Sequence, residues 1–218
     1  MPNWCYTQII FQGEKEELKE FRSKIKEWTR KNYVENGFGV NWLGNILHGA
    51  GLGHRIDSGD DRIRCRGEIS YIGYVGPDED STMGTFDIET ETAWAPMCLM
   101  WTEVIKAMGY KSIGFSYHAE EPGCELYEIY DPYGYFDEKY YIDIYLDGED
   151  EKNDKLMRLY DDKYLHTDEV LRYELQRLLD TDEENLKTLI DKAENYEFKS
   201  EDSYLYVHEY NYVDSIEE

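Results

Sequence analysis

The sequence is poor in basic residues. Its 218 residues include 23 lysines and arginines against 48 aspartates and glutamates, which gives a formal net charge of -25 and a pI near 4.5. A field of this sign repels nucleic acid and anionic membranes, and it attracts basic surfaces. We therefore expect no direct binding of nucleic acid or membrane, and a partner with a basic surface. A solvated acidic surface without any partner is the alternative.

Long apolar runs and closely spaced cysteines are also missing. No run of 18 apolar residues occurs, so we expect no transmembrane helix. The start at Met1 shows neither the basic nor the apolar region of a signal peptide. The four cysteines, Cys5, Cys65, Cys98 and Cys124, lie at least 26 residues apart, which excludes a CxxC zinc or redox motif. These absences predict a cytoplasmic protein with reduced thiols, in the host cytoplasm if a phage encodes it.

Strand and helix patterns alternate through the first two thirds of the chain. The apolar residues of 14–31 recur at helical spacing, and so do those that follow Pro96, up to Gly109. Residues 36–61 are Gly-rich, and only 41–47 is expected to form a short helical turn. Strands are predicted at residues 4–11 (ended by Gly13), 63–74, 82–92, 112–118, 125–130 and 140–146.

This order of elements predicts the α+β class. Two helices that each follow a strand, over an antiparallel sheet, are typical of a ferredoxin-like domain. We assign this domain to residues 1–146, with the Gly-rich insertion at 36–61. In such a sheet, Phe86 and Ile88 would face the two packed helices.

Residues 147–218 are predicted to form an acidic helical extension that ends in a strand. A charged linker at 147–155 precedes a helix that begins after Thr167, with Val170 among its inward residues. A capping box at Thr181–Glu184 is expected to open a second helix. The terminal strand covers residues 203–213 and is rich in tyrosine.

Four short motifs are shared with a known family. They are Met1-Pro2-Asn3-Trp4-Cys5, Asn41-Trp42-Leu43-Gly44-Asn45, Thr92-Ala93-Trp94-Ala95-Pro96, and Tyr117 with Glu121-Pro122-Gly123. In this order they resemble the YubB ferredoxin-like family of phages, plasmids and bacteria, over about residues 1–146. The second proline usual at the corner is Met97 here. The resemblance implies a ferredoxin-like fold and a mobile-element context, but it implies no reaction and no catalytic residue.

Acidic and aromatic rows supply the candidate binding residues. Asp87, Glu89 and Glu91 alternate with apolar residues, so they are expected to face water in a row about 6.6–6.8 Å apart. Asp182, Glu183 and Glu184 are secondary candidates. Tyr204, Tyr206, Tyr210 and Tyr212 lie on one side of the terminal strand, either as half-buried packing or as an interface.

Catalytic and metal sites have weaker support. His118 with Glu121 could act in acid–base chemistry, although the resemblance places Glu121 in a turn. His48 and His54 could bind a metal, but their spacing fits no tight ligand motif. We therefore assign no catalytic residue, no metal and no cofactor. Arg62, Arg64 and Arg66 form a basic strip that could meet a phosphate.

Three functions are compatible with these patterns. The favoured hypothesis is a non-enzymatic phage or mobile-element protein that inhibits a host CRISPR effector or restriction nuclease by mimicking the charge of nucleic acid. An enzyme, metal-assisted or hydrolytic, centred on His118 or on His48 and His54, is the second. An accessory module that binds host proteins through the C-terminal extension is the third. The sequence does not predict the oligomeric state.

Overall fold

The computed structural model describes residues 3–76 and 82–216, so Met1 and Pro2 of the first family motif lie outside the described residues. The chain is of the α+β class and divides into two compact units. The first unit contains residues 1–135 and 212–218, and the second contains residues 136–211. This division differs from the predicted boundary after residue 146.

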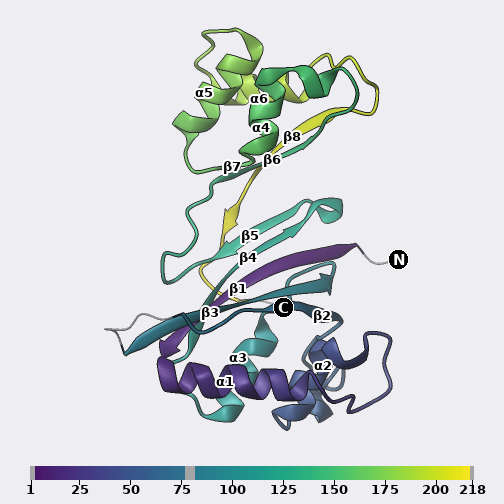
Figure 1. Ribbon diagram of the computed structural model, residues 1–218, viewed down its shortest axis with the longest axis vertical. Helices are drawn as coiled ribbons and strands as arrows, with labels where there is room; N and C mark the ends of the chain where they lie inside the picture. The colour runs from purple at the N-terminus through teal and green to yellow at the C-terminus, as the bar shows by residue number, and fades with distance from the viewer. Residues whose placement is uncertain (1–2, 77–81, 217–218) are drawn as a thin grey trace. The chain divides into compact units, whose positions relative to one another are not determined.

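A six-stranded sheet organises the first unit (Figure 1). Its strand order is β2-β3-β1-β4-β5-β9, and β1 is central and pairs antiparallel with both β3 and β4. The strands are β1 (Trp4–Glu14), β2 (Gly67–Ile72), β3 (Met83–Ala93), β4 (Gly114–Glu121), β5 (Leu126–Tyr130) and β9 (Asn211–Tyr212). The sheet is therefore larger than a four-stranded one, and its last strand comes from the end of the chain.

Three predicted strands have bounds that differ from the observed ones. The strand predicted at 112–118 is β4, which runs from Gly114 to Glu121. β1 continues through Gly13, because a Cβ there would lie 2.9 Å from the backbone oxygen of Ser112, and glycine allows this close approach. The predicted strand at 63–74 is regular only at Gly67–Ile72.

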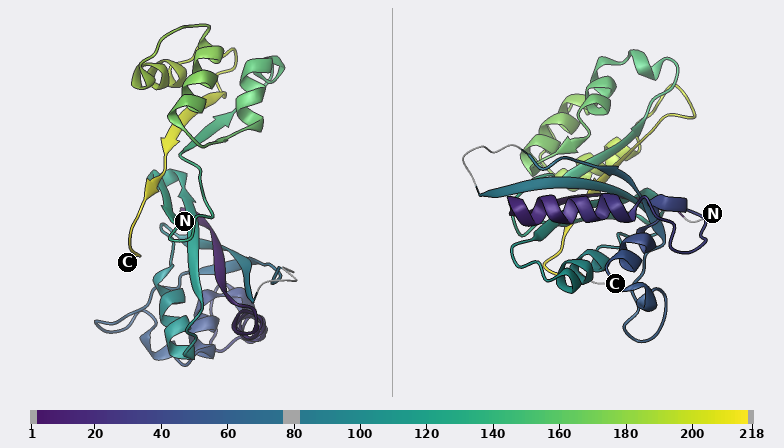
Figure 2. Two further views of the ribbon diagram at one scale, coloured as in Figure 1. Left: turned by 90° about the vertical axis from the view of Figure 1, so that its left-hand side faces the viewer. Right: turned by 60° about the horizontal axis from the view of Figure 1, so that its bottom comes forward.

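Three helices cover one face of this sheet (Figure 1, Figure 2). They are α1 (Lys15–Trp28), α2 (Leu43–Gly49) and α3 (Leu99–Met108). The centre of their common core is Phe11, whose ring lies 5.1 to 5.6 Å from four other aromatic rings, of Phe21, Phe86, Trp101 and Phe115. Burial of each such side chain contributes about 1.5–3 kcal/mol. α3 ends, as predicted, at Gly109 in the left-handed conformation.

The Gly-rich insertion is more regular than predicted. It contains α2 and the short 3-10 turns Gly39–Asn41 and Gly53–Arg55. The fully buried Asn45 organises it, because its side chain accepts a hydrogen bond from the Tyr33 amide and donates to the Gly39 and Val40 carbonyls. One amide side chain thus fixes two segments of loop backbone.

The second unit packs three helices on one face of a three-stranded antiparallel sheet (Figure 1). The sheet order is β7-β6-β8, and its apolar core includes Ile142, Ile144 and Leu205. The strands are β6 (Tyr140–Tyr145), β7 (Tyr164–Leu165) and β8 (Tyr204–Glu209), and the helices are α4 (Asp154–Asp161), α5 (Asp168–Leu179) and α6 (Leu186–Glu194). The predicted strand at 140–146 belongs here because it pairs with β8.

The predicted linker at 147–155 is structured. It contains a 3-10 turn at Asp150–Lys152 and the start of α4. Asp150 is buried, and its carboxylate accepts hydrogen bonds from the backbone amides of Lys199 and Ser200 at 2.8 to 3.1 Å. Burial raises the pKa of Asp150, but these hydrogen bonds outweigh it, and the net pKa is lowered.

Of the two helix starts predicted in the second unit, one is confirmed and the other is wrong. Thr167 caps α5 as predicted, with its hydroxyl accepting from the Val170 amide, although Val170 itself is exposed. The predicted capping box does not open α6, because the Thr181 amide still bonds to the Gln176 carbonyl at the end of α5. Asn185 caps α6 instead.

Candidate functional site

The acidic row of β3 lies on the sheet face that the helices leave uncovered. Phe86 and Ile88 are buried in the core, whereas Asp87 and Glu89 are half-buried and Glu91 is exposed. The predicted alternation along β3 is therefore confirmed. It follows from the period of two in a strand.

Carboxylates from the neighbouring strands join this row around Tyr6. Glu68 of β2 lies directly opposite Glu91, and Tyr6 of β1 lies between Glu91 and Glu120 of β4. The pKa of Tyr6 is raised to about 12 by burial and by the charges of Glu89, Glu120 and Asp87. We call Glu68, Asp87, Glu89, Glu91 and Glu120 the acidic sheet face.

Sequence reasoning missed Glu68 and Glu120, because cross-strand register decides which side chains share a face. Directly opposed like charges such as Glu68 and Glu91 cost about 0.2–1 kcal/mol. Strands β1 to β5, which the structure describes in full, contain no lysine or arginine to offset them.

The secondary acidic residues belong to the other unit. Asp182, Glu183 and Glu184 lie in the connection between α5 and α6. Glu183 makes hydrogen bonds within this connection. Its carboxylate accepts one from the Asn185 amide, and its backbone carbonyl accepts one from the Gln176 side chain. Asp182 and Glu184 are exposed.

The predicted row of four tyrosines is divided. Tyr204 and Tyr206 are exposed on β8, on the sheet face away from the helices. Tyr210 is buried between β8 and β9, and Tyr212 is an exposed residue of the first unit. The strand is interrupted after Glu209, so the alternation does not continue to Tyr212.

Tyr204 and Tyr206 instead join aromatic rings of the neighbouring strands. Tyr204 stacks on Tyr145 with centroids 6.0 Å apart, and Tyr206 lies 5.7 Å from Tyr204. The contacts continue through His208 to Tyr141 and Tyr164. These six rings form what we call the aromatic sheet face of the second unit.

The structure does not assemble His118 and Glu121 into an acid–base pair. Three residues apart on β4, they point to opposite faces of the sheet, and Glu121 accepts the Gly123 amide in the turn that the family resemblance implies. His118 lies 3.4 Å from Glu120 instead. Burial lowers the pKa of His118 to about 4, so its ring is neutral near pH 7.

The two loop histidines are not arranged as ligands. His48 stacks on Tyr33 with centroids 5.7 Å apart, and His54 is exposed in a separate turn. Within residues 3–76 and 82–216, no three His, Cys, Asp or Glu side chains come together as a metal-binding group. His48 therefore has a packing role.

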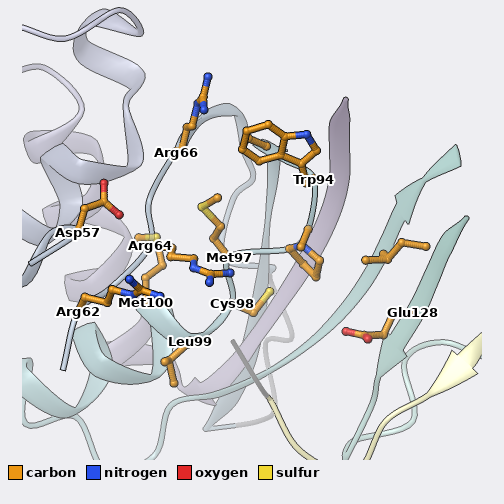
Figure 3. Close-up of a pocket in the computed structure, with 14 residues that line it drawn as sticks. Asp57, Arg62, Arg64, Arg66, Trp94, Met97, Cys98, Leu99, Met100 and Glu128 are labelled. Carbon is orange, nitrogen blue, oxygen red and sulfur yellow. The ribbon is translucent and has the colours of Figure 1, made fainter. Parts of the chain in front are cut away.

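The three arginines that sequence analysis noted as a strip line a cavity of about 610 Å³ in the first unit (Figure 3). Arg62, Arg64 and Arg66 are exposed and alternate with the buried Ile63 and Cys65. The remaining lining comes from Asp57, the segment from Ala93 to Met100, Leu126 and Glu128. Three segments distant in the sequence thus form one site, which sequence analysis could not assemble.

The corner at Trp94 forms one edge of this cavity. Trp94 has a φ of 68°, a left-handed conformation that costs about 1–2 kcal/mol for a residue other than glycine. Three hydrogen bonds hold it: Trp94 N–H to the Asn3 carbonyl at 2.9 Å, Thr92 hydroxyl to the Ala95 carbonyl at 2.8 Å, and Ala93 N–H to the Arg66 carbonyl at 2.9 Å. The indole remains 48% exposed, with the Arg66 guanidinium 4.9 Å from its ring.

Comparison with models of known protein families, with curated proteins and with solved structures finds no match for this chain. Among the residues that the structure describes, no helix has the length and apolar character that a membrane span requires.

Proposed function

We propose that this chain is a non-enzymatic phage or mobile-element protein that inhibits a host nucleic-acid-binding defence enzyme. The acidic sheet face would occupy the basic groove of a CRISPR effector or restriction nuclease, with carboxylates in place of phosphates. The proposal is carried by one observation: Glu68 and Glu91 stand directly opposite each other on strands without any basic residue. A protein without a basic partner would gain nothing from this repulsion.

The fold is compatible with the family resemblance. We propose that the first unit is a ferredoxin-like domain related to the YubB family. The order β2-β3-β1-β4, with helices after β1 and β3, is the arrangement that βαββαβ units form, and β5 and β9 extend it. A cytoplasmic location in the host follows from the same proposal.

The test is a pull-down from nuclease-treated bacterial lysate, eluted with rising salt and read by mass spectrometry. We expect a nucleic-acid enzyme to bind and to elute between low and high salt, because screening weakens exposed charge pairs. The triple variant Asp87→Asn, Glu89→Gln, Glu91→Gln should lose this partner.

A matched triple variant controls for net charge. Glu16→Gln, Glu20→Gln and Glu27→Gln remove the same charge from α1, which packs on the opposite side of the sheet. This variant should keep the partner. Binding that persists in high salt and in the β3 variant would refute the mimicry.

A protein-binding module is a second candidate, favoured by the aromatic sheet face. Tyrosine is enriched at protein interfaces because its ring is apolar and its hydroxyl polar. A partner held by Tyr204 and Tyr206 should stay bound in high salt and be lost in the double variant Tyr204→Ala, Tyr206→Ala. Tyr173→Ala, at an exposed tyrosine of α5, is the control.

A further inference from the structure

The arginine-lined cavity has a charge opposite to that of the chain. Arg55 of the preceding turn is neutralised by Glu103 and by Asp61 at 3.0 Å. Arg62, in contrast, makes no hydrogen bond or ion pair with any residue between 3–76 or 82–216. An unpaired guanidinium is notable in a chain with a charge of -25, because carboxylates are abundant.

The backbone fixes the direction of the arginines. Ile63 and Cys65 are 0% and 1% exposed, so they anchor the extended segment in the core. The alternating side chains of Arg62 and Arg64 are then directed to the cavity, and Figure 3 shows both near the start of α3. Guanidinium groups arranged in this way hold phosphate oxygens through paired N–H donors.

The opposite parts of the cavity have different chemistry. Trp94 offers an exposed indole, and the Arg66 guanidinium lies over its ring. The indole is a surface on which a planar ring can stack. Across the cavity lies Glu128 (Figure 3). Its carboxylate accepts a hydrogen bond of 2.5 Å from the Tyr117 hydroxyl. Glu128 is therefore held in place as an acceptor for N–H or O–H groups.

We propose that this cavity is a binding site for a nucleoside monophosphate. Arg62 and Arg64 hold the phosphate, the base stacks at Trp94, and Glu128 accepts a hydrogen bond from an amino or hydroxyl group of the nucleoside. The volume of about 610 Å³ lies within the range of about 300–1,000 Å³ that small-molecule sites occupy. This site is separate from the acidic sheet face and does not depend on its proposed function.

Simpler ligands leave part of the cavity unused. Inorganic phosphate would meet the arginines but not Trp94, and an uncharged aromatic molecule would leave Arg62 without a counter-charge. A long nucleic acid would meet the repulsion of the surrounding chain. The arginines, the indole and the carboxylate together therefore favour a small ligand with one phosphate and one planar ring.

The experiment is isothermal titration calorimetry of the full chain with adenosine 5′-monophosphate and guanosine 5′-monophosphate. We expect one of them to bind with a Kd below about 1 mM. Adenosine or guanosine without phosphate, and inorganic phosphate alone, should bind at least about tenfold more weakly, because each lacks one charge-assisted or stacking contact.

Variants separate this site from general charge effects. Arg62→Gln should weaken binding about tenfold, whereas Arg30→Gln, at an exposed arginine beyond the end of α1, should leave it unchanged. Trp94→Ala should weaken binding and Trp94→Phe should restore most of it. Thermal melts of each variant establish that it is folded.

Three results would overturn the proposal. The first is the absence of binding by both mononucleotides, whether or not a single-stranded oligonucleotide binds. The second is an equal loss in Arg62→Gln and Arg30→Gln. The third is a mononucleotide that binds equally well after Arg62→Gln and Trp94→Ala, because it would occupy a different site.

Discussion

Trp94 allows the backbone strain at the arginine-lined cavity to be measured. Trp94→Ala removes the indole but keeps a Cβ in the left-handed conformation at φ 68°, whereas Trp94→Gly removes both. Relief of the left-handed strain is worth about 1–2 kcal/mol. The greater freedom of glycine in the unfolded chain takes back about 0.5–1 kcal/mol. We therefore expect the glycine variant to be more stable than the alanine variant by about 1 kcal/mol.

The assay can be confined to the first unit. All five tryptophans lie there, so tryptophan fluorescence during urea or thermal unfolding reports this unit alone. Both variants retain the same four tryptophans, and their transitions can be compared directly. A difference of about 1 kcal/mol corresponds to about 3 °C in Tm for a unit of this size.

A position with an ordinary backbone provides the control. Thr29 has a φ of -73°, so Thr29→Gly should be less stable than Thr29→Ala, the opposite order to Trp94. If Trp94→Gly proved no more stable than Trp94→Ala, the corner would not be strained.

Three further changes test the packing and the ionisation of buried groups. Asp150→Ala should lower the free energy of unfolding by about 3 kcal/mol, because two backbone amides lose a charged acceptor. Gly49→Ala should cost about 1–3 kcal/mol, because the new Cβ would lie 2.2 Å from the ring of Trp28. The lowered pKa of His118 means that the unfolded state binds its proton more readily. Stability should therefore fall as the pH decreases from about 6.5 to about 4, and His118→Gln should reduce this dependence.

Matched measurements accompany these three changes. Glu151→Ala, at an exposed neighbour of Asp150, should stay within about 0.5 kcal/mol of the parent, and an equal loss in both would contradict the role of Asp150. Gly37→Ala should be harmless, since nothing lies within 4 Å of its Cβ position. For His118, an imidazole that titrates near pH 6.5 in NMR spectra would contradict the prediction.

The local spacing of apolar residues was sufficient to predict the helix and the strand that pack around Phe11. The helical spacing of Leu18, Phe21 and Ile25 predicts α1, and all three are fully buried. The alternation along β3 predicts which side of the strand carries Asp87 and Glu89. These features depend on periodicity within one segment, which the sequence expresses directly.

Pairing between distant segments was not predictable in the same way. The composition of 147–155 resembles a linker, and only the tertiary contact of Asp150 with the 199–200 turn shows that it is ordered. Thr181 and Asn185 are both good helix caps, and the end of α5 decides between them. Long-range contacts of this kind leave no local signature.

The candidate sites also depend on contacts between distant segments. His118 and Glu121 point in opposite directions because β4 continues to Glu121, three residues beyond the predicted end of the strand. The cavity could not be assembled, because Arg62, Trp94 and Glu128 come from three separate segments. Only the register of the sheet and the left-handed corner bring them together.

The position of β9 has a consequence for synthesis of the chain. β9 occupies the sheet edge next to β5, but its two residues are the last residue of the second unit, Asn211, and the residue after it, Tyr212. On the ribosome, β5 is therefore an open edge strand until residues 211 and 212 have emerged, and open edges pair readily with other chains. A protein cut short before β9 would keep that edge permanently.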